Sequence, residues 1–83
     1  MRVEVEMDQD PASVGEVYIV RDQARYSIAS IVWGKQGHRD CEIIVIYDGI
    51  KLAPDELVKV VDRLVRKICK KWGYTNICVK HVR

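Results

Sequence analysis

The sequence predicts a small α+β domain in which one long amphipathic helix packs on one face of an antiparallel-rich sheet. Apolar residues recur every three or four positions over residues 54–72, as they do along one side of a helix. Four β-rich segments precede this helix, separated by polar loops and turns, and one more follows it. The predicted order is therefore β-β-β-β-α-β, within a single domain that spans residues 1–83.

The first three strands are predicted from alternation and from turn residues. Residues 2–7 alternate apolar and charged side chains, which is typical of a strand with one buried face. A loop with Asp, Pro, Ser and Gly follows at 8–15. The β-rich runs 16–21 and 24–33 flank Asp22-Gln23, and this spacing predicts a hairpin, although Asp-Gln is a poorer turn pair than Asn-Gly.

The fourth strand is the most apolar part of the chain. A polar loop with two glycines, 34–40, leads into residues 41–47, whose apolar side chains point to both faces. Asp48-Gly49 is predicted to form a turn before the helix. Because a helix connects strand 75–82 to the fourth strand, we expect the last strand to run parallel to the fourth strand, or to another strand that points the same way.

The helix has an acidic start and a basic end, as its dipole favours. Pro54 suits the first helical position, although Ala53 would be a poor N-cap. Gly73 is the predicted C-cap, because glycine adopts a left-handed conformation freely. The predicted buried side is formed by Leu57, Val61, Leu64, Val65, Ile68 and Trp72, with Val58 and Val60 widening it.

A single helix covers only one face of such a sheet. In the fourth strand Ile43 and Val45 lie on one face, and Ile44 and Ile46 lie on the other. The second pair would meet water in an isolated molecule, whereas self-association through the open face or an edge strand would bury it. We therefore expect a homodimer.

Composition narrows the class of protein. The chain is 48% apolar, enough for a core, yet it has no run of about 18 apolar residues, so no membrane partner is expected. Its acidic, alternating start is unlike a signal peptide, which favours a cytoplasmic location. Cys41, Cys69 and Cys78 lack CxxC spacing, so we expect buried thiols and neither a disulfide framework nor a zinc site.

Charge is distributed unevenly along the chain. Residues 1–16 hold five acids and one base, for a net charge of −4, whereas residues 59–83 hold eight bases and one acid, for +7. A basic segment of this size favours an acidic partner such as a nucleic acid. The alternative is internal: the acidic first strand would lie beside the basic last strand and neutralise it.

One side of the helix is basic. Four cations form a stripe at spacings of four, three and four, with a fifth beside it: Lys59, Arg63, Arg66, Lys70 and Lys67. Phosphates are attracted to such a stripe by charge and by counterion release. The alternative is a solvated helix side, since Asp55 and Asp62 can each pair with a cation four residues later.

The loop 34–40 carries a second basic group. Lys35, His38 and Arg39 lie in it, and a hairpin tip reaches a groove or a phosphate easily. Trp33 at its base offers a ring on which a nucleobase could stack. The alternative is a flexible polar turn. If the loop and the basic helix side lie on the same side of the molecule, they form one binding surface.

Catalytic signatures are sparse. Asp40, Glu42 and Asp48 bracket the fourth strand, but Asp40 and Asp48 would be ~20–27 Å apart along it. Carboxylates that share a metal ion must lie closer together, so no metal site is predicted. His38 or His81 would serve as an acid–base group in RNA cleavage. Nucleotide-binding and metalloprotease motifs are absent from the sequence, and no residue pattern is diagnostic of a family.

The leading interpretation is a small non-catalytic binding protein, without a cofactor, that binds nucleic acid through the basic helix side and loop 34–40. Its contacts would be mainly to phosphate and therefore weakly sequence-specific. The first alternative is a homodimeric protein-interaction module or inhibitor that uses the open sheet face. The second is a small metal-dependent nuclease that acts through Asp40, Glu42 or His38.

Overall fold

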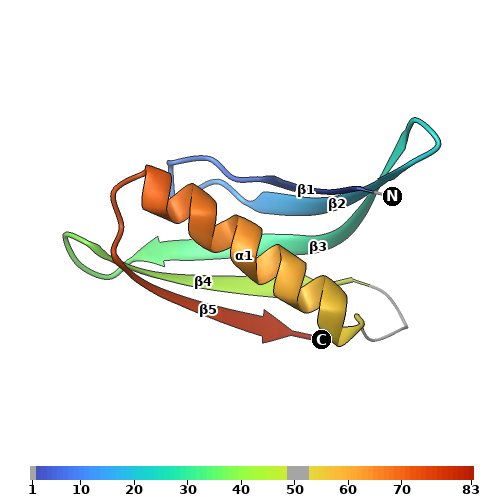
Figure 1. Cartoon of the computed structure of the whole chain (residues 1–83). Helices are drawn as coiled ribbons and strands as arrows, with labels where there is room; N and C mark the ends of the chain where they lie inside the picture. The colour runs from blue at the N-terminus through green and yellow to red at the C-terminus, as the bar shows by residue number, and fades with distance from the viewer. Residues whose placement is uncertain (1, 49–52) are drawn as a thin grey trace.

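The computed structural model describes residues 2–48 and 53–83. In this part of the chain, one helix lies on a five-stranded sheet (Figure 1). The elements in chain order are β1 (Arg2–Glu6), β2 (Gly15–Arg21), β3 (Ala24–Lys35), β4 (Asp40–Tyr47), α1 (Asp55–Lys71) and β5 (Asn76–Val82). The α+β class and the order β-β-β-β-α-β are confirmed; the predicted turn at Asp48-Gly49 lies partly outside the described residues.

The strands lie side by side in the order in which they occur in the chain. β1 to β4 form an antiparallel meander, and β5 pairs in parallel with β4, as expected for two strands joined by a helix. β1 and β5 are therefore the two opposite edges, about 19 Å apart at ~4.8 Å per strand. The alternative in which the acidic first strand neutralises the basic last strand is thus wrong, because three strands separate them.

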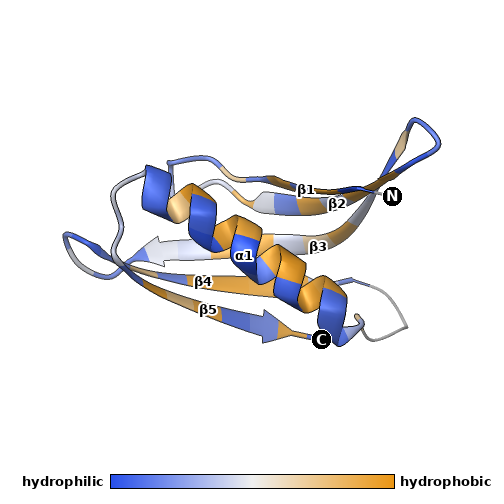
Figure 2. Cartoon of the chain, viewed as in Figure 1, coloured by the Kyte–Doolittle hydropathy of each residue, from blue (hydrophilic) through white to orange (hydrophobic). Residues whose placement is uncertain are grey.

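The helix crosses one face of the sheet diagonally, from β5 at its start towards β1 at its end (Figure 1). At its start, Asp55 forms an ion pair with Arg83, just after β5. At its end, Ile68 and Trp72 line a hollow of about 760 Å³ together with Val5 and neighbouring residues of the β1–β2 loop. Figure 2 shows hydrophobic and hydrophilic residues alternating along α1, which is the pattern of a helix with one buried side.

The predicted N-cap and C-cap of the helix differ in how well they agree with the structure. Pro54 is the N-cap, in an extended conformation, so the helix begins one residue later than predicted and Ala53 is not the cap. No side chain caps this end. At the other end Gly73 has a φ of +97°, and the Tyr74 amide donates to the Cys69 carbonyl at 3.1 Å. This is a Schellman motif, and it confirms the role predicted for Gly73.

The hairpin between β2 and β3 confirms the predicted one and has a strained turn. Asp22 and Gln23 have φ values of 50° and 66°. Two consecutive left-handed residues form a type I′ turn, which matches the twist of the flanking strands. Neither residue is a glycine, so each pays a steric cost for the left-handed conformation.

The core lies between α1 and the middle strands. Its fully buried side chains are Val17, Ala29, Ile31, Ile43, Val45, Val61, Val65 and Cys69. Trp33 is 5% exposed, packs against the Trp72 ring at 5.4 Å between centroids, and donates from Nε1 to the Asp8 carbonyl at 3.2 Å. The prediction that Trp33 offers a ring for base stacking is therefore wrong. β3 extends two residues further than predicted and carries this side chain into the core.

The face of the sheet away from α1 is apolar at its centre. Val32, Ile46 and Val82 are 46%, 40% and 49% exposed on this face, with Ile44 half-buried among them. The predicted placement of Ile44 and Ile46 opposite the helix is confirmed. Cys78 is also exposed there, whereas Cys41 and Cys69 are buried as predicted. The expectation that Cys78 is buried is wrong, because the alternation of β5 directs it away from the helix.

Candidate nucleic-acid interface

A shallow hollow lies between α1 and the β5 edge of the sheet. Its volume is about 460 Å³, and it is lined by Val58, Lys59, Asp62, Arg63, Arg66 and His81. Three of the five predicted helix cations therefore share this surface. The other two, Lys67 and Lys70, are exposed in the last turns of the same helix. The structure thus places the first three cations of the stripe beside the edge strand β5, and the last two follow the helix away from that edge (Figure 1).

Within the part of the chain that the structure describes, most cations on this side of the molecule have no acidic partner. Asp62 pairs with Arg66 four residues later, as the solvated-side alternative requires, but Asp55 pairs with Arg83 and leaves Lys59 alone. Among residues 2–48 and 53–83, the ion pairs do not include the following side chains: Lys35, Arg39, Lys59, Arg63, Lys67, Lys70 and Lys71. Their charges are therefore directed to solvent and produce a positive field over α1.

The acidic residues of the first strand are paired locally. Glu4 and Glu6 both contact Arg25 of β3, at 3.3 and 3.0 Å, and Glu4 also contacts Arg2 at 3.1 Å. These pairs lie at the β1 side of the sheet, opposite the edge that carries the hollow. Glu4 and Glu6 are thus neutralised by arginines of β1 and β3 and do not reach the hollow at the β5 edge.

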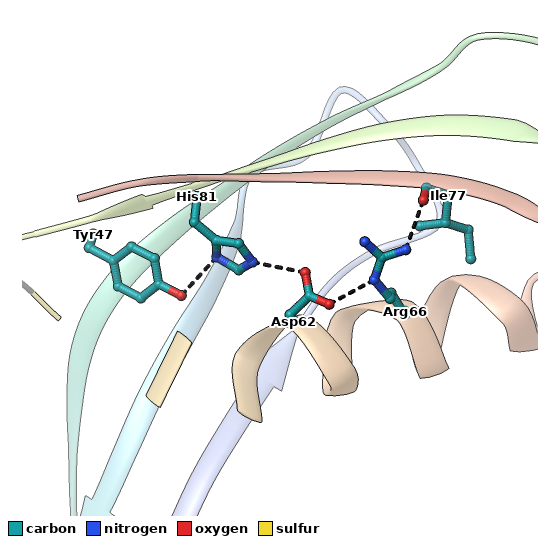
Figure 3. A network of polar contacts seen from close by, with 5 residues as sticks. All are labelled: Tyr47, Asp62, Arg66, Ile77 and His81. Carbon is teal, nitrogen blue, oxygen red and sulfur yellow. Dashed lines mark hydrogen bonds and ion pairs between the residues drawn. The ribbon is translucent and has the colours of Figure 1, made fainter. Parts of the chain in front are cut away.

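Three residues that line the hollow, Asp62, Arg66 and His81, belong to a chain of polar contacts (Figure 3). The Tyr47 hydroxyl lies 3.0 Å from His81 Nδ1, and His81 Nε2 lies 2.9 Å from Asp62 Oδ1. Arg66 Nε donates to Asp62 Oδ2 at 2.7 Å, and Arg66 Nη1 donates to the Ile77 carbonyl at 2.9 Å. The network joins β4, β5 and α1 and has its centre at His81, whose side chain is 12% exposed.

Arg66 has a different role from the other stripe cations. Two of its nitrogens are already used, one by Asp62 and one by a backbone carbonyl of the edge strand β5. Strand edges expose backbone groups that need partners, and this contact supplies one. Arg66 therefore fastens the helix to the sheet, and a phosphate would have to share it with those contacts. Among the described residues, the side chains of Lys59 and Arg63 beside it make no such hydrogen bond or ion pair.

The network also perturbs two ionisable groups. Partial burial raises the pKa of Asp62, but hydrogen bonds from His81 and Arg66 outweigh it and hold the pKa below its usual value. Burial raises the pKa of Tyr47 to about 12, with Arg83 opposing the shift. Asp62 is therefore a carboxylate and Tyr47 a neutral phenol at neutral pH. This fits a tautomer in which His81 donates from Nε2 to Asp62 and accepts from Tyr47 at Nδ1.

The β3–β4 loop lies at the C-terminal end of the helix. The Arg39 carbonyl accepts hydrogen bonds from the Thr75 and Asn76 amides, both at 3.0 Å, so the loop is joined to the segment that leaves α1. His38 and Arg39 are exposed in this loop. Figure 1 shows the loop and the end of α1 at the same end of the molecule.

The loop is shorter than predicted. Lys35 pairs with Cys41 at the end of the β3–β4 ladder, so it belongs to β3 and not to the flexible tip. Its side chain is nevertheless exposed. The basic residues of the loop and the last turns of the helix, with Lys67 and Lys70, thus occupy one end of the molecule. The hollow extends this basic region along α1 towards its start.

The residues considered for catalysis do not form a reactive site. Asp40 accepts from the Asn76 side-chain amide at 2.6 Å, and Glu42 pairs with Lys80 at 3.2 Å. In the described part of the chain, no three His, Cys, Asp or Glu side chains lie close enough to hold a metal ion. Both ring nitrogens of His81 are engaged, which leaves none for proton transfer to a substrate. His38 lies in the loop, with no hydrogen bond between its side chain and another described residue.

Sequence reasoning missed Tyr47 and Asp62 as members of this site. One signal was present: His81 shares a strand face with Ile77 and Val79, and a polar side chain on a buried face needs hydrogen-bond partners. The partners come from β4 and from the middle of α1, and local spacing does not connect those segments to β5.

Comparison with protein-family models, with curated proteins and with solved structures gives no significant match. Within the described residues, no helix has the length and apolar character needed to cross a bilayer.

Proposed function

We propose that this protein is a small non-catalytic binding protein that binds nucleic acid through the exposed side of α1 and the adjoining β3–β4 loop. The observation that supports this proposal is a set of exposed cations without acidic partners among the described residues: Lys59, Arg63, Lys67 and Lys70 along the helix, and Arg39 in the loop at the same end of the molecule as the last helical turn (Figure 1). A solvated helix side that served stability alone would be expected to balance its charges with i,i+4 partners. Only Arg66 has such a partner in the described residues.

The contacts are proposed to be made to phosphates. Lysine and arginine side chains that point to solvent bind the sugar-phosphate backbone without reading bases. Trp33, the ring expected to stack on a base, is buried, and Trp72 and Tyr74 pack against it. Binding is therefore expected to be weakly sequence-specific and strongly salt-dependent, because each phosphate contact releases counterions.

The test is a titration of labelled duplex DNA, single-stranded DNA and RNA at several salt concentrations. The decisive variant is the double charge reversal Arg63→Glu with Lys70→Glu, which leaves the Arg66 contacts intact. We expect its affinity to fall at least tenfold at low salt, and the slope of log affinity against log salt to become shallower by about one unit for each lost phosphate contact.

The matched control is Arg2→Glu with Arg21→Glu. This pair changes the net charge by the same amount but lies at the β1 and β2 side of the sheet, where both side chains are exposed. The control should keep most of the wild-type affinity. Equal loss in both double variants would mean that net charge alone drives binding, and it would refute the location of the site.

The second candidate function is a homodimeric protein-interaction module or inhibitor that uses the open sheet face. The observation that favours it is the exposure of Val32, Ile46 and Val82 on that face. No specific observation favours the third candidate, a metal-dependent nuclease, since Asp40 and Glu42 have other partners. Incubation of DNA and RNA with the protein and Mg²⁺ or Mn²⁺ tests it, and cleavage lost in Glu42→Gln would restore it.

We also propose that the protein acts in the cytoplasm. Cys41, Cys69 and Cys78 are all free thiols, and Cys78 is exposed. An exposed free thiol is typical of a reducing compartment. Fractionation of the cells that make the protein, with detection by antibody, is the direct test.

A further inference from the structure

The open face carries a contiguous apolar patch across three strands. Val32 of β3 lies beside Ile44 of β4, and Ile46 of β4 lies beside Val82 of β5. Three of these four side chains are 40–49% exposed. A contiguous exposed apolar patch of this kind is typical of a surface that another molecule covers.

Charged residues flank this patch in a particular arrangement. Glu42 and Cys78 are register partners on β4 and β5, and two residues further along Ile44 and Lys80 are register partners. The four side chains therefore occupy the corners of a rectangle on the open face. Glu42 and Lys80 lie at the ends of one diagonal, joined by an ion pair of 3.2 Å, and Cys78 and Ile44 lie at the ends of the other.

We infer that the open face binds a second copy of this chain, related by a two-fold axis that runs close to the line from Cys78 to Ile44. For sides of ~4.8 and ~6.6 Å, a rotation about this line brings each end of the other diagonal to within about 2.5 Å of its opposite end, so Glu42 of each copy faces Lys80 of the second copy. The same rotation places Val32 of one copy opposite Ile46 of the other. Acid thus meets base and apolar meets apolar, which is the self-complementarity that a two-fold interface requires.

The strand edges are less suited to pairing than this face. At the β5 edge, the Ile77 carbonyl already accepts a hydrogen bond from Arg66. At the β1 edge, the short strand carries Arg2, Glu4 and Glu6 on its open side. Short, charged or occupied edges discourage strand addition. Face-to-face packing also leaves α1 on the outside of both copies, so it does not cover the basic helix side.

The size of the face sets the expected affinity. Five strands at ~4.8 Å spacing, each presenting about four residues at ~6.6 Å, give a face of roughly 630 Å². Contact between two copies would bury at most about 1,270 Å² in total, at the lower bound for stable complexes and close to the size of weak and reversible ones. A monomer–dimer equilibrium with a dissociation constant in the micromolar range is therefore expected.

The first experiment measures the mass of the full chain in solution from low micromolar to about 500 µM, without nucleic acid. We expect a reversible dimer, and a short bismaleimide should link the two Cys78 thiols, because they lie near the axis. Cys78→Ser should abolish the link, since Cys41 and Cys69 are buried. A monomeric mass throughout this range would overturn the inference and assign the face to a different partner.

The second experiment uses charge exchange between copies and leaves the apolar residues untouched. Glu42→Lys alone and Lys80→Glu alone place like charges opposite each other in a homodimer, and each should dimerise at least tenfold more weakly than the wild type. In a mixture of the two variants, every Glu or Lys at these positions meets an opposite charge across the axis. We therefore expect the mixed dimer to recover wild-type affinity, and a mixture that stays monomeric would refute the two-fold arrangement.

One further variant and its control test the contribution of the apolar patch to dimer affinity. Ile44→Asp should lower the dimer affinity at least tenfold, whereas Tyr26→Asp should leave it unchanged, because Tyr26 is 56% exposed but lies on the other side of β3. A dimer that persists in Ile44→Asp would contradict the proposed face. These results are independent of phosphate binding, because no nucleic acid is present.

Discussion

Asp62 of the helix and His81 of the last strand are joined through Oδ1 and Nε2 at 2.9 Å, in a place where the His81 side chain is 12% exposed. This contact links the middle of α1 to the edge of the sheet, and Tyr47 extends it to β4. Whereas the apolar core holds the helix against the face of the sheet, this directional contact sets the position of the helix relative to strands β4 and β5. Asp62, Arg66 and His81 also line the hollow beside α1.

Removal of the imidazole should therefore destabilise the domain. In His81→Ala, the Tyr47 hydroxyl loses its partner and Asp62 keeps only Arg66, both in a partly buried place, and we expect a loss of about 2 kcal/mol in the free energy of unfolding. Urea denaturation measures it. Lys80→Ala, one residue away on the open face, should change the free energy by less than about 1 kcal/mol, as for an exposed ion pair. Equal effects would show that the network does not stabilise the fold.

Acid should weaken the same network. The pKa of Asp62 is lower in the folded protein than its usual value of 3.8, so its ionised form stabilises the fold at pH values above that value. This contribution is lost as the pH falls through the folded pKa, below 3.8. The difference in unfolding free energy between wild type and Asp62→Asn should accordingly be constant above about pH 5 and shrink towards pH 3.

The control for this pH series is Asp55→Asn. The Arg83 hydrogen bond lowers the pKa of Asp55 too, but Asp55 is exposed and lies outside the network, so it reports an isolated surface pair. Its effect on stability should be smaller at every pH. A difference for Asp62→Asn that does not vary between pH 6 and pH 3 would be incompatible with a depressed pKa at Asp62.

Substitutions of Arg63 and Arg66 should have opposite relative effects on the stability of the fold and on nucleic-acid affinity. Arg66→Gln breaks hydrogen bonds to Asp62 and to the Ile77 carbonyl and should cost about 1–2 kcal/mol of stability. Arg63→Gln has no such contacts and should change stability by less than about 0.5 kcal/mol. In nucleic-acid titrations the order should reverse, with Arg63→Gln weakening affinity more. If Arg66→Gln has the larger effect on affinity at a concentration where both variants are folded, the division of roles is wrong.

The β2–β3 turn offers a stabilising substitution far from both proposed surfaces. Gln23 has a φ of 66°, and glycine relieves the cost of that conformation while Asp22 keeps the favoured Asp-Gly order of a type I′ turn. We expect Gln23→Gly to raise the free energy of unfolding by about 0.5–1 kcal/mol. Gln23→Ala, which retains a Cβ, should give no such gain. A thermal melt that shows the same midpoint for both variants would argue against a left-handed residue here.

The local sequence pattern predicted most of the helix and strand positions but few of the side-chain contacts between them. Periodicities of two and of three to four residues located every element, since burial of one face imposes them on the sequence. The end of β3 was misplaced because Lys35 pairs with Cys41, a contact between strands that no local composition encodes. The same error put Trp33 near solvent. Cys78 was assigned to the core by residue type, whereas its alternation with Ile77 and Val79 indicated the opposite face.

The sequence predicted which cations form the candidate surface, but not that Arg66 stabilises the fold while the others remain available for binding. Helical spacing placed the cations on one side of α1, and the structure brings the β3–β4 loop to the end of that helix. That Arg66 serves the fold follows only from its distance to Ile77, eleven residues away in the chain. Whether the acidic and basic segments cancel depended on strand order, which a hydrophobic pattern does not determine.

The exposed cations of α1 also act at a distance. Within the described residues most of them lack acidic partners, whereas Glu4 and Glu6 of β1 are paired with Arg2 and Arg25, so the positive field of the domain is strongest on the helix side. A polyanion is attracted to that side before any contact forms, so the molecule rotates as it approaches. Productive encounters become more frequent than random collision allows, and this gain disappears when salt shortens the reach of the field.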